Sequence, residues 1–174
     1  MLFRSQIYLG QYADTMRHVF NVSPTFEFRY KFSDVSQLRI NYRGTTSQPA
    51  MADLLDIVDD SDPLNVHRGN PGLKPSFTNS FRFFYNTYKE RRRQTLMSFL
   101  DYSNMRNAVS NRVTYDETTG GRTTQPDNIN GNWNVNAGLI FNTGIDSAGV
   151  FNVNTFSNLG YNNYVGTTRS KSVV

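Results

Sequence analysis

Strict alternation of apolar and polar side chains over residues 20–32 is the feature that most constrains what this chain can fold into. In FNVSPTFEFRYKF one phase is wholly apolar and mostly aromatic, and the other is wholly polar, with Glu27, Arg29 and Lys31 at its C-terminal end. Successive side chains of a β-strand point to opposite faces, so this period of two predicts a strand with rings on one side and charges on the other. Such a strand needs surroundings that are apolar on one side and wet on the other.

The same alternation recurs along the chain and predicts about seven strands. SQLRINYR follows a turn at residues 33–35 and completes an antiparallel hairpin with the first run. Alternating runs also cover residues 76–88, 132–142 and 150–162, and residues 3–9 are a further expected strand. The run QTLMSFLDYSNM is apolar on both phases, so the alternation does not assign its faces.

The connections between these strands alternate between short and long. The long ones are expected at about residues 44–75, where a short helical turn could form near residues 52–57, and at about residues 115–131, which are rich in Thr, Gly and Asn. In an up-and-down meander this rhythm puts all tight turns at one end of the sheet and all long loops at the other. Bacterial outer-membrane barrels have that asymmetry.

Composition and strand length favour a membrane sheet over a soluble one. Hydrophobic residues make up only 37% of the 174-residue chain, yet it holds 13 Phe and 10 Tyr. The runs over residues 19–32 and 76–88 exceed the ~5–6 residues of most soluble strands and suit the ~9–11 residues of a membrane strand. No run of about 18 apolar residues predicts a transmembrane helix, and the first residues lack the pattern of a secretory signal, so an export signal is expected upstream.

Backbone pairing in hydrocarbon requires a closed barrel, because every N–H and C=O must find a partner within the protein. Seven strands are too few to close around a wet lumen. The expected fold is therefore all-β: an antiparallel up-and-down meander that is a segment of a large transmembrane β-barrel. Residues 1–174 are expected to be one partial barrel domain, without a plug or a closing strand, in the bacterial cell outer membrane.

The two phases of the alternation give two sets of candidate residues. Those expected to face lipid belong to the apolar phase: Phe26, Phe28, Tyr30, Leu38, Ile40, Tyr42, Phe81, Phe83, Trp133, Val135, Phe151 and Val153. Those expected to face the lumen belong to the polar phase: Glu27, Arg29, Lys31, Arg39, Asn41, Arg43, Arg82, Asn134 and Asn152. The lumen-facing set could guide an anionic solute, contact a plug, or simply keep the wall hydrated.

Signals of catalysis, metal binding and nucleic-acid binding are weak. His18 and His67 are not part of a nucleophile–base arrangement, and no cofactor motif is present, so no enzyme activity and no cofactor are expected. The five aspartates within residues 53–62 lack the EF-hand spacing, so a solvated acidic loop without metal is expected. The basic run at residues 89–93 fits a turn at a membrane surface better than a nucleic-acid patch, and the net charge of +4 is modest.

A family resemblance is carried by two stretches of the chain. Residues 47–86, with GNPGLKP before an aromatic strand, and TYDETTGGRTTQPDNINGNW resemble the barrel region of Bacteroidetes-type TonB-dependent receptors, and the resemblance covers about residues 21–164. Ser76 departs from the pattern, because that family commonly has Glu there. The resemblance implies a barrel of about 22 strands with an N-terminal plug. It also implies import of a scarce nutrient, powered through TonB by an inner-membrane energising complex.

Two other interpretations stay open at this point. One is a soluble all-β module that binds carbohydrate, for example, through exposed aromatic rings, and the other is an outer-membrane barrel with a structural role and no transport. The first of these predicts that the aromatic phase lies buried under a second layer of the same chain. An importer predicts that this phase is left uncovered by the chain itself.

Overall fold

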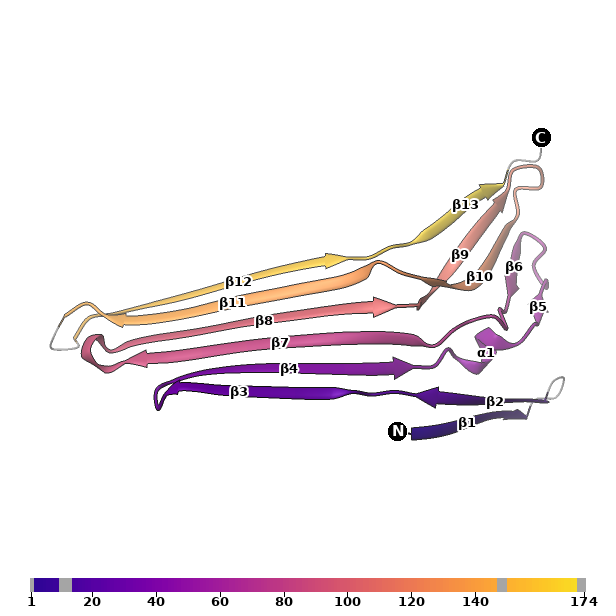
Figure 1. Cartoon of the computed structure of the whole chain (residues 1–174). Coiled ribbons are helices and arrows are strands. Elements are labelled where there is room, and N and C mark those ends of the chain that lie inside the picture. Colours follow the sequence, from indigo (N-terminus) through magenta and orange to yellow (C-terminus); the bar gives the residue numbers. More distant parts are fainter. Residues whose placement is uncertain (1, 10–13, 147–149, 172–174) are drawn as a thin grey trace.

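The computed structural model describes residues 2–9, 14–146 and 150–171, and nearly all of its regular structure is β-strand (Figure 1). It confirms the expected all-β, largely antiparallel fold. None of its described helices is long and apolar enough to cross a membrane.

Six strands form the main sheet, in the order β12-β11-β8-β7-β4-β3. Their bounds are β3 Thr25–Ser33, β4 Ser36–Ser47, β7 Ser76–Lys89, β8 Gln94–Arg106, β11 Asn132–Gly144 and β12 Asn152–Asn163. All neighbours are antiparallel. The three short connections, β3–β4, β7–β8 and β11–β12, lie together at one end of the sheet, and the two long connections leave from the other end (Figure 1). We call these long connections, residues 48–75 and 107–131, the first and the second excursion. The rhythm of short and long connections therefore predicts the topology correctly.

The first alternating run is two strands, and the prediction of one continuous strand over residues 20–32 is wrong. β2 (Asp14–Asn21) ends before Pro24 and pairs with β1 (Leu2–Leu9) in a separate two-stranded sheet, whereas β3 begins at Thr25. Proline has no N–H to donate to a strand ladder, so it interrupts the pairing. The carbonyl of Pro24 still accepts a hydrogen bond of 2.8 Å from the Gly44 amide, which keeps this segment beside β4.

The two excursions and β13, which follows β12, form a second sheet in the order β13-β9-β10-β6-β5. Its strands are β5 Val58–Asp59, β6 Asn65–Arg68, β9 Ala108–Asp116, β10 Arg122–Ile129 and β13 Thr167–Lys171, with helix α1 at Met51–Leu54. β9 continues β8 beyond Asn107, a residue with φ 51° whose amide donates to Asn130 Oδ1 over 2.8 Å. The stretches expected as long loops therefore contain α1, β5, β6 and β10, and β4 extends as far as Ser47.

Buried apolar side chains are confined to the excursions. Among the described side chains the buried hydrophobic residues are Leu55, Leu73, Ala108 and Ile129, and none of them lies on the main sheet. The main sheet is a single layer with both faces open: Phe26 is 58% exposed on one face, and Phe156 is 67% exposed on the other. The condition set for a soluble module, a second layer over the rings, is not met by the described residues.

Candidate functional site

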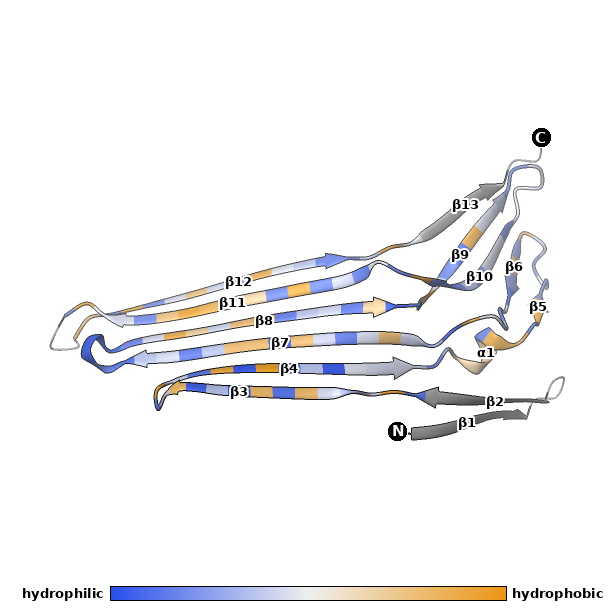
Figure 2. Ribbon diagram, in the orientation of Figure 1, coloured by the Kyte–Doolittle hydropathy of each residue, from blue (hydrophilic) through white to orange (hydrophobic). Residues whose placement is uncertain are grey.

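The strand register brings the apolar phases of all six strands of the main sheet onto one surface, which we call the aromatic face. Tyr42 lies opposite Phe81, which lies opposite Tyr102, and Phe28, Ile40 and Phe83 form the next row. Figure 2 shows the resulting bands of hydrophobic and hydrophilic residues along the strands. Eleven of the twelve residues of the expected lipid-facing set share this face: Phe26, Phe28, Tyr30, Leu38, Ile40, Tyr42, Phe81, Phe83, Trp133, Val135 and Val153.

Phe151 is the remaining member of that set and lies outside the sheet. It precedes β12, in the connection from β11, and its carbonyl accepts a hydrogen bond of 2.9 Å from the Ile145 amide. The side chain is exposed. Phe151 therefore belongs to the end of the sheet that carries the short turns.

Two groups of touching rings mark the aromatic face. Towards the long excursions the ring centroids of Tyr42, Phe81, Tyr102, Trp133 and Tyr161 follow one another at 4.8, 6.3, 6.4 and 5.1 Å across five strands. Near the short turns Phe28, Tyr30, Phe32 and Tyr85 follow at 6.4, 4.9 and 6.2 Å. Tyr and Trp suit surroundings that are apolar at one end and wet at the other. The Tyr42 hydroxyl donates to Asn79 Oδ1 over 2.9 Å, so even this polar tip is satisfied.

The opposite surface of the main sheet, the polar face, collects the whole expected lumen-facing set. Its rows are again cross-strand neighbours, and the residues are Glu27, Arg29, Lys31, Arg39, Asn41, Arg43, Arg82, Asn134 and Asn152. Five of them are cations and one is an anion. Asn residues dominate the part contributed by β11 and β12, so charge is concentrated on β3, β4 and β7.

Asp101 is a polar-face carboxylate that the sequence pattern did not reveal. It lies on β8, which is apolar on both phases, so only the register shows that it is opposite Arg82. The two side chains form an ion pair with Arg82 Nε 2.5 Å from Asp101 Oδ1, and Arg29 pairs with Glu27 at the same distance. Arg82 and Arg29 are largely exposed, and exposed pairs contribute only about 0–1 kcal/mol each.

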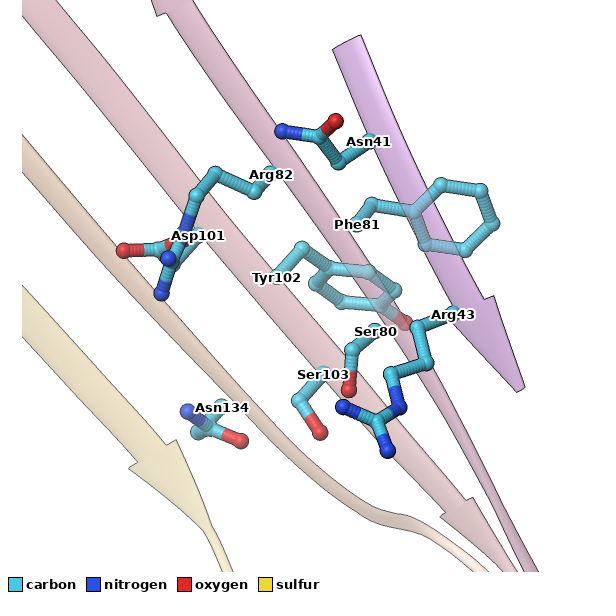
Figure 3. A pocket seen from close by; sticks show the side chains of 9 residues that line it. All are labelled: Asn41, Arg43, Ser80, Phe81, Arg82, Asp101, Tyr102, Ser103 and Asn134. Atoms are coloured by element: carbon cyan, nitrogen blue, oxygen red, sulfur yellow. The ribbon is translucent and has the colours of Figure 1, made fainter. Parts of the chain in front are cut away.

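A hollow of about 490 Å³ lies beside the Arg82–Asp101 pair (Figure 3). Its polar lining on the polar face comes from β4, β7, β8 and β11: Asn41, Arg43, Ser80, Arg82, Asp101, Ser103 and Asn134. Arg43, Ser80 and Ser103 belong to one row, and the Arg43 guanidinium extends alongside the two hydroxyls (Figure 3). This hollow can receive a hydrogen-bonding or anionic group. It contains no nucleophile–base pair.

Five apolar residues interrupt the polar face near the short turns, and we call them the apolar island. They were not anticipated, because the polar phase had looked hydrophilic almost throughout. They come from the four strands β7, β8, β11 and β12: Phe84, Met97, Phe99, Ile140 and Phe156.

The GNPGLKP motif, residues 69–75, joins the two excursions. The Asn70 side chain donates to the Pro126 carbonyl over 3.0 Å and accepts from the Gly72 amide over 2.9 Å. Asn128 of the second excursion accepts from the Lys74 amide over 2.7 Å and donates to the Lys74 carbonyl over 3.0 Å. Leu73, at the centre of the motif, is fully buried. The motif that carries the family resemblance therefore has a structural role in this chain.

The aspartates of the excursions shape turns. Asp59 Oδ1 accepts from the Ser61 hydroxyl over 2.7 Å and from the Ser61 amide over 3.2 Å, and these hydrogen bonds hold the pKa of Asp59 below its ordinary value of 3.8. Asp62 accepts in the same way from Asn65 and Leu64, which lowers its pKa too. Among the described residues no group of three or more His, Asp or Glu side chains is placed to hold a metal ion. The side chain of His18 lies outside the described part of the chain.

Comparison with known protein families gives one match. The model of the Outer membrane protein beta-barrel family matches residues 6–173. No match is found among curated proteins.

Proposed function

This chain belongs to the Outer membrane protein beta-barrel family, and we propose that it forms part of the wall of a TonB-dependent receptor that imports a nutrient. Membership of the family places the protein in the bacterial outer membrane. The observation that carries the proposal is the single-layer main sheet, whose two faces differ in chemistry everywhere except at the apolar island. A wall between hydrocarbon and a wet interior needs such a sheet.

In this proposal the aromatic face contacts membrane lipid and the polar face lines the lumen. Lipid contact suits the exposed rings of this face, such as Phe28 on β3 and Phe83 on β7, which no part of the described chain covers. The edge strands β3 and β12 carry backbone groups that need partners in hydrocarbon, so further strands complete the barrel.

Import is supported by the form of the wall and by the resemblance of residues 47–86 and 114–133 to TonB-dependent receptors. The solute enters from the end of the long excursions, where the second sheet forms an ordered rim. It then passes along a polar face whose free cations and amides can exchange hydrogen bonds with it. A plug domain inside the barrel gates the passage, and the TonB complex supplies the energy to move that plug.

The proposal is tested in the organism that carries the gene. Three strains are compared: a deletion of this gene, a deletion of tonB, and the gene deletion complemented with the intact gene. Uptake from a defined medium is followed by mass spectrometry of the cell contents. The expected result is at least one nutrient whose uptake is lost in both deletions and restored by complementation.

A barrel with a structural role and no transport gives the opposite pattern. The gene deletion then changes envelope integrity, measured as sensitivity to detergent, while no nutrient depends on both this gene and tonB. That result would overturn the import proposal and leave the membership of the family untouched.

A further inference from the structure

The three short turns of the main sheet lie against one another at the end opposite the excursions. The Tyr88 amide, at the end of β7, donates to the Val35 carbonyl in the β3–β4 turn over 2.9 Å. A Cβ added to Gly144, at the end of β11, would lie 3.9 Å from the Arg92 carbonyl oxygen in the β7–β8 turn. The turns therefore form one surface, which we call the turn platform: residues 33–35, 89–93, 144–146 and 150–151.

Four exposed cations gather in the β7–β8 turn of the platform. They are Lys89, Arg91, Arg92 and Arg93, and Glu90 is the anion among them. The short helix Glu90–Arg92 and Arg93, which has φ 48°, hold the run in a tight turn, so the charges cannot spread along an extended segment. None of the four cations forms an ion pair within the described part of the chain. An anion from elsewhere would relieve their mutual repulsion.

A hollow of about 370 Å³ lies between this turn and the β11–β12 connection. The guanidinium side chains of residues 91–93 line it, and its carboxylates are Glu90 and Asp146. The Asp146 carboxylate is already engaged, because it accepts from the Val150 and Phe151 amides over 3.0 and 2.9 Å. The hollow therefore keeps an excess of positive charge. Arginine binds phosphate well, because its planar guanidinium can donate two parallel hydrogen bonds to phosphate oxygens.

Exposed apolar side chains adjoin the hollow. Ile145 lines it and is 69% exposed, and Phe151, which is 66% exposed, accepts a hydrogen bond at its carbonyl from the Ile145 amide. This bond continues the register of Thr143 and Val153, so both residues fall in the phase of the aromatic face. Val150 beside them is 71% exposed. A soluble anion would leave these side chains in water, whereas an anion that carries hydrocarbon chains covers them.

The aromatic face of β7 indicates that the platform lies at the depth of lipid headgroups. Successive positions of that face carry a phenyl ring, a phenol, a hydroxyl and an ammonium group, in the order Phe83, Tyr85, Thr87 and Lys89. This order matches the passage from hydrocarbon to headgroups, because tyrosine suits the interface and lysine extends its charge towards water. Short turns of outer-membrane barrels lie on the periplasmic side, so the adjacent leaflet is the inner one.

We propose that the turn platform binds an anionic phospholipid of the inner leaflet, with its phosphate at the arginines of residues 91–93 and its acyl chains over Ile145 and Phe151. Clusters of about four or more Lys and Arg beside a membrane-spanning segment are typical of sites for anionic lipids. A zwitterionic lipid fits less well, since its ammonium group is repelled by the arginines. The inference rests on the proposed contact of the aromatic face with lipid, and it does not require import.

Fluorescence quenching by brominated lipids in reconstituted vesicles tests the proposal. The full-length protein carries V150C as its one cysteine, labelled with the apolar fluorophore bimane. The vesicles consist of phosphatidylethanolamine and contain the same fraction of either brominated phosphatidylglycerol, which is anionic, or brominated phosphatidylethanolamine. R91Q/R92Q removes two cations of the platform, and the matched control R68Q/R122Q removes the same charge from the second sheet. R91K/R92K keeps the charge, and heat-modifiable mobility on a gel shows that each variant is folded.

The expected result is a severalfold preference for phosphatidylglycerol over phosphatidylethanolamine in the unsubstituted turn. The preference should disappear in R91Q/R92Q and persist in R91K/R92K and in R68Q/R122Q. Soluble glycerol phosphate in excess should leave the quenching unchanged, because it lacks the acyl chains.

Equal quenching by the two lipids, or a preference that survives in R91Q/R92Q, would overturn the proposal. Full relief of quenching by glycerol phosphate would overturn the choice of a lipid as the ligand. No quenching by either lipid would overturn the proposal together with the orientation of the sheet. None of these outcomes depends on the uptake experiment, so a failure of import and a failure of lipid binding are distinguishable.

Discussion

The ring of Phe99 on β8 lies over Gly138 on β11, so closely that a methyl group on the glycine would meet ring atoms at 2.2 Å. The two residues are directly opposite each other in the antiparallel register. Glycine weakens a strand because it has no side chain to pack, and here a cross-strand aromatic ring supplies the missing contact. The pair fixes where the Phe99 ring can lie.

Replacing Gly138 by alanine should therefore displace the Phe99 ring. We expect a loss of about 1–3 kcal/mol in the free energy of unfolding, which is the usual cost of overpacking. Reversible urea unfolding in lipid vesicles measures it. G160A on β12 is the control, since the nearest atom to its new Cβ, Asn136 Oδ1, is at an ordinary contact distance of 3.8 Å. Equal losses in the two variants would contradict the packing of Phe99 on Gly138.

The two faces of β3 should respond differently to a new charge. F28R places a guanidinium on the aromatic face, and we expect a loss of roughly 2–4 kcal/mol of stability in lipid, as for a cation at the middle of a membrane strand. T25R, on the polar face of the same strand, should cost clearly less, about 0–1 kcal/mol, which reflects its position directly opposite Arg43. The same unfolding assay compares them, and similar losses for both variants would argue against lipid contact of the aromatic face.

Asn128 should hold the two excursions together. N128A removes the acceptor for the Lys74 amide and the donors to the Lys74 and Asn107 carbonyls. Each such hydrogen bond contributes about 0.5–1.5 kcal/mol. The Lys74 amide should exchange its hydrogen much faster, at least tenfold, while amides in β8 and β11 stay protected. N111A, at an exposed position on β9, is the control, and unchanged exchange at Lys74 in N128A would refute the link.

The turn after β9 should loosen in acid. Hydrogen bonds from the Thr118 amide, together with contacts from Thr119, hold the pKa of Asp116 below its ordinary value of 3.8. A carboxyl whose pKa is lowered by folding stabilises the turn fully above 3.8, and that contribution is lost as the pH falls through the lowered value. Exchange at the Thr118 amide, corrected for its intrinsic pH dependence, should therefore accelerate below about pH 4. D116N should exchange quickly at every pH, and a wild-type turn insensitive to acid would count against this assignment.

Alternation predicted the main sheet well because the side chains of β3, β4, β7, β11 and β12 divide into two phases, with Phe84, Ile140 and Phe156 as apolar exceptions on the polar face. It could not place β8, where Met97 and Phe99 are as apolar as Leu96 and Leu100, so it missed Asp101 and the part of the apolar island that β8 contributes. These features depend on the register with β7 and β11, which is a property of pairing between distant segments. A local pattern does not contain it.

The second sheet was beyond the sequence pattern for a different reason. β5, β6 and β10 are short and rich in Asn, Thr and Asp, and β6 pairs in parallel with β10, which is far away in the chain. The hydrogen bonds of Asn70 and Asn128 hold these strands in place, and a composition typical of loops conceals them. The break at Pro24, by contrast, can be predicted from the residue type alone, because proline has no N–H to donate to a strand ladder.

The strand order of the second sheet has a mechanical consequence for the wall. β13 continues β12 but pairs with β9, the continuation of β8, although β11 separates β12 from β8 in the main sheet. Beyond the end of the main sheet that carries the excursions, the pairing of β13 with β9 therefore links β12 to β8, which are not adjacent in the main sheet. Separating β12 from β11 would therefore also require breaking the hydrogen bonds between β13 and β9. We expect the barrel wall to resist lateral opening between β11 and β12.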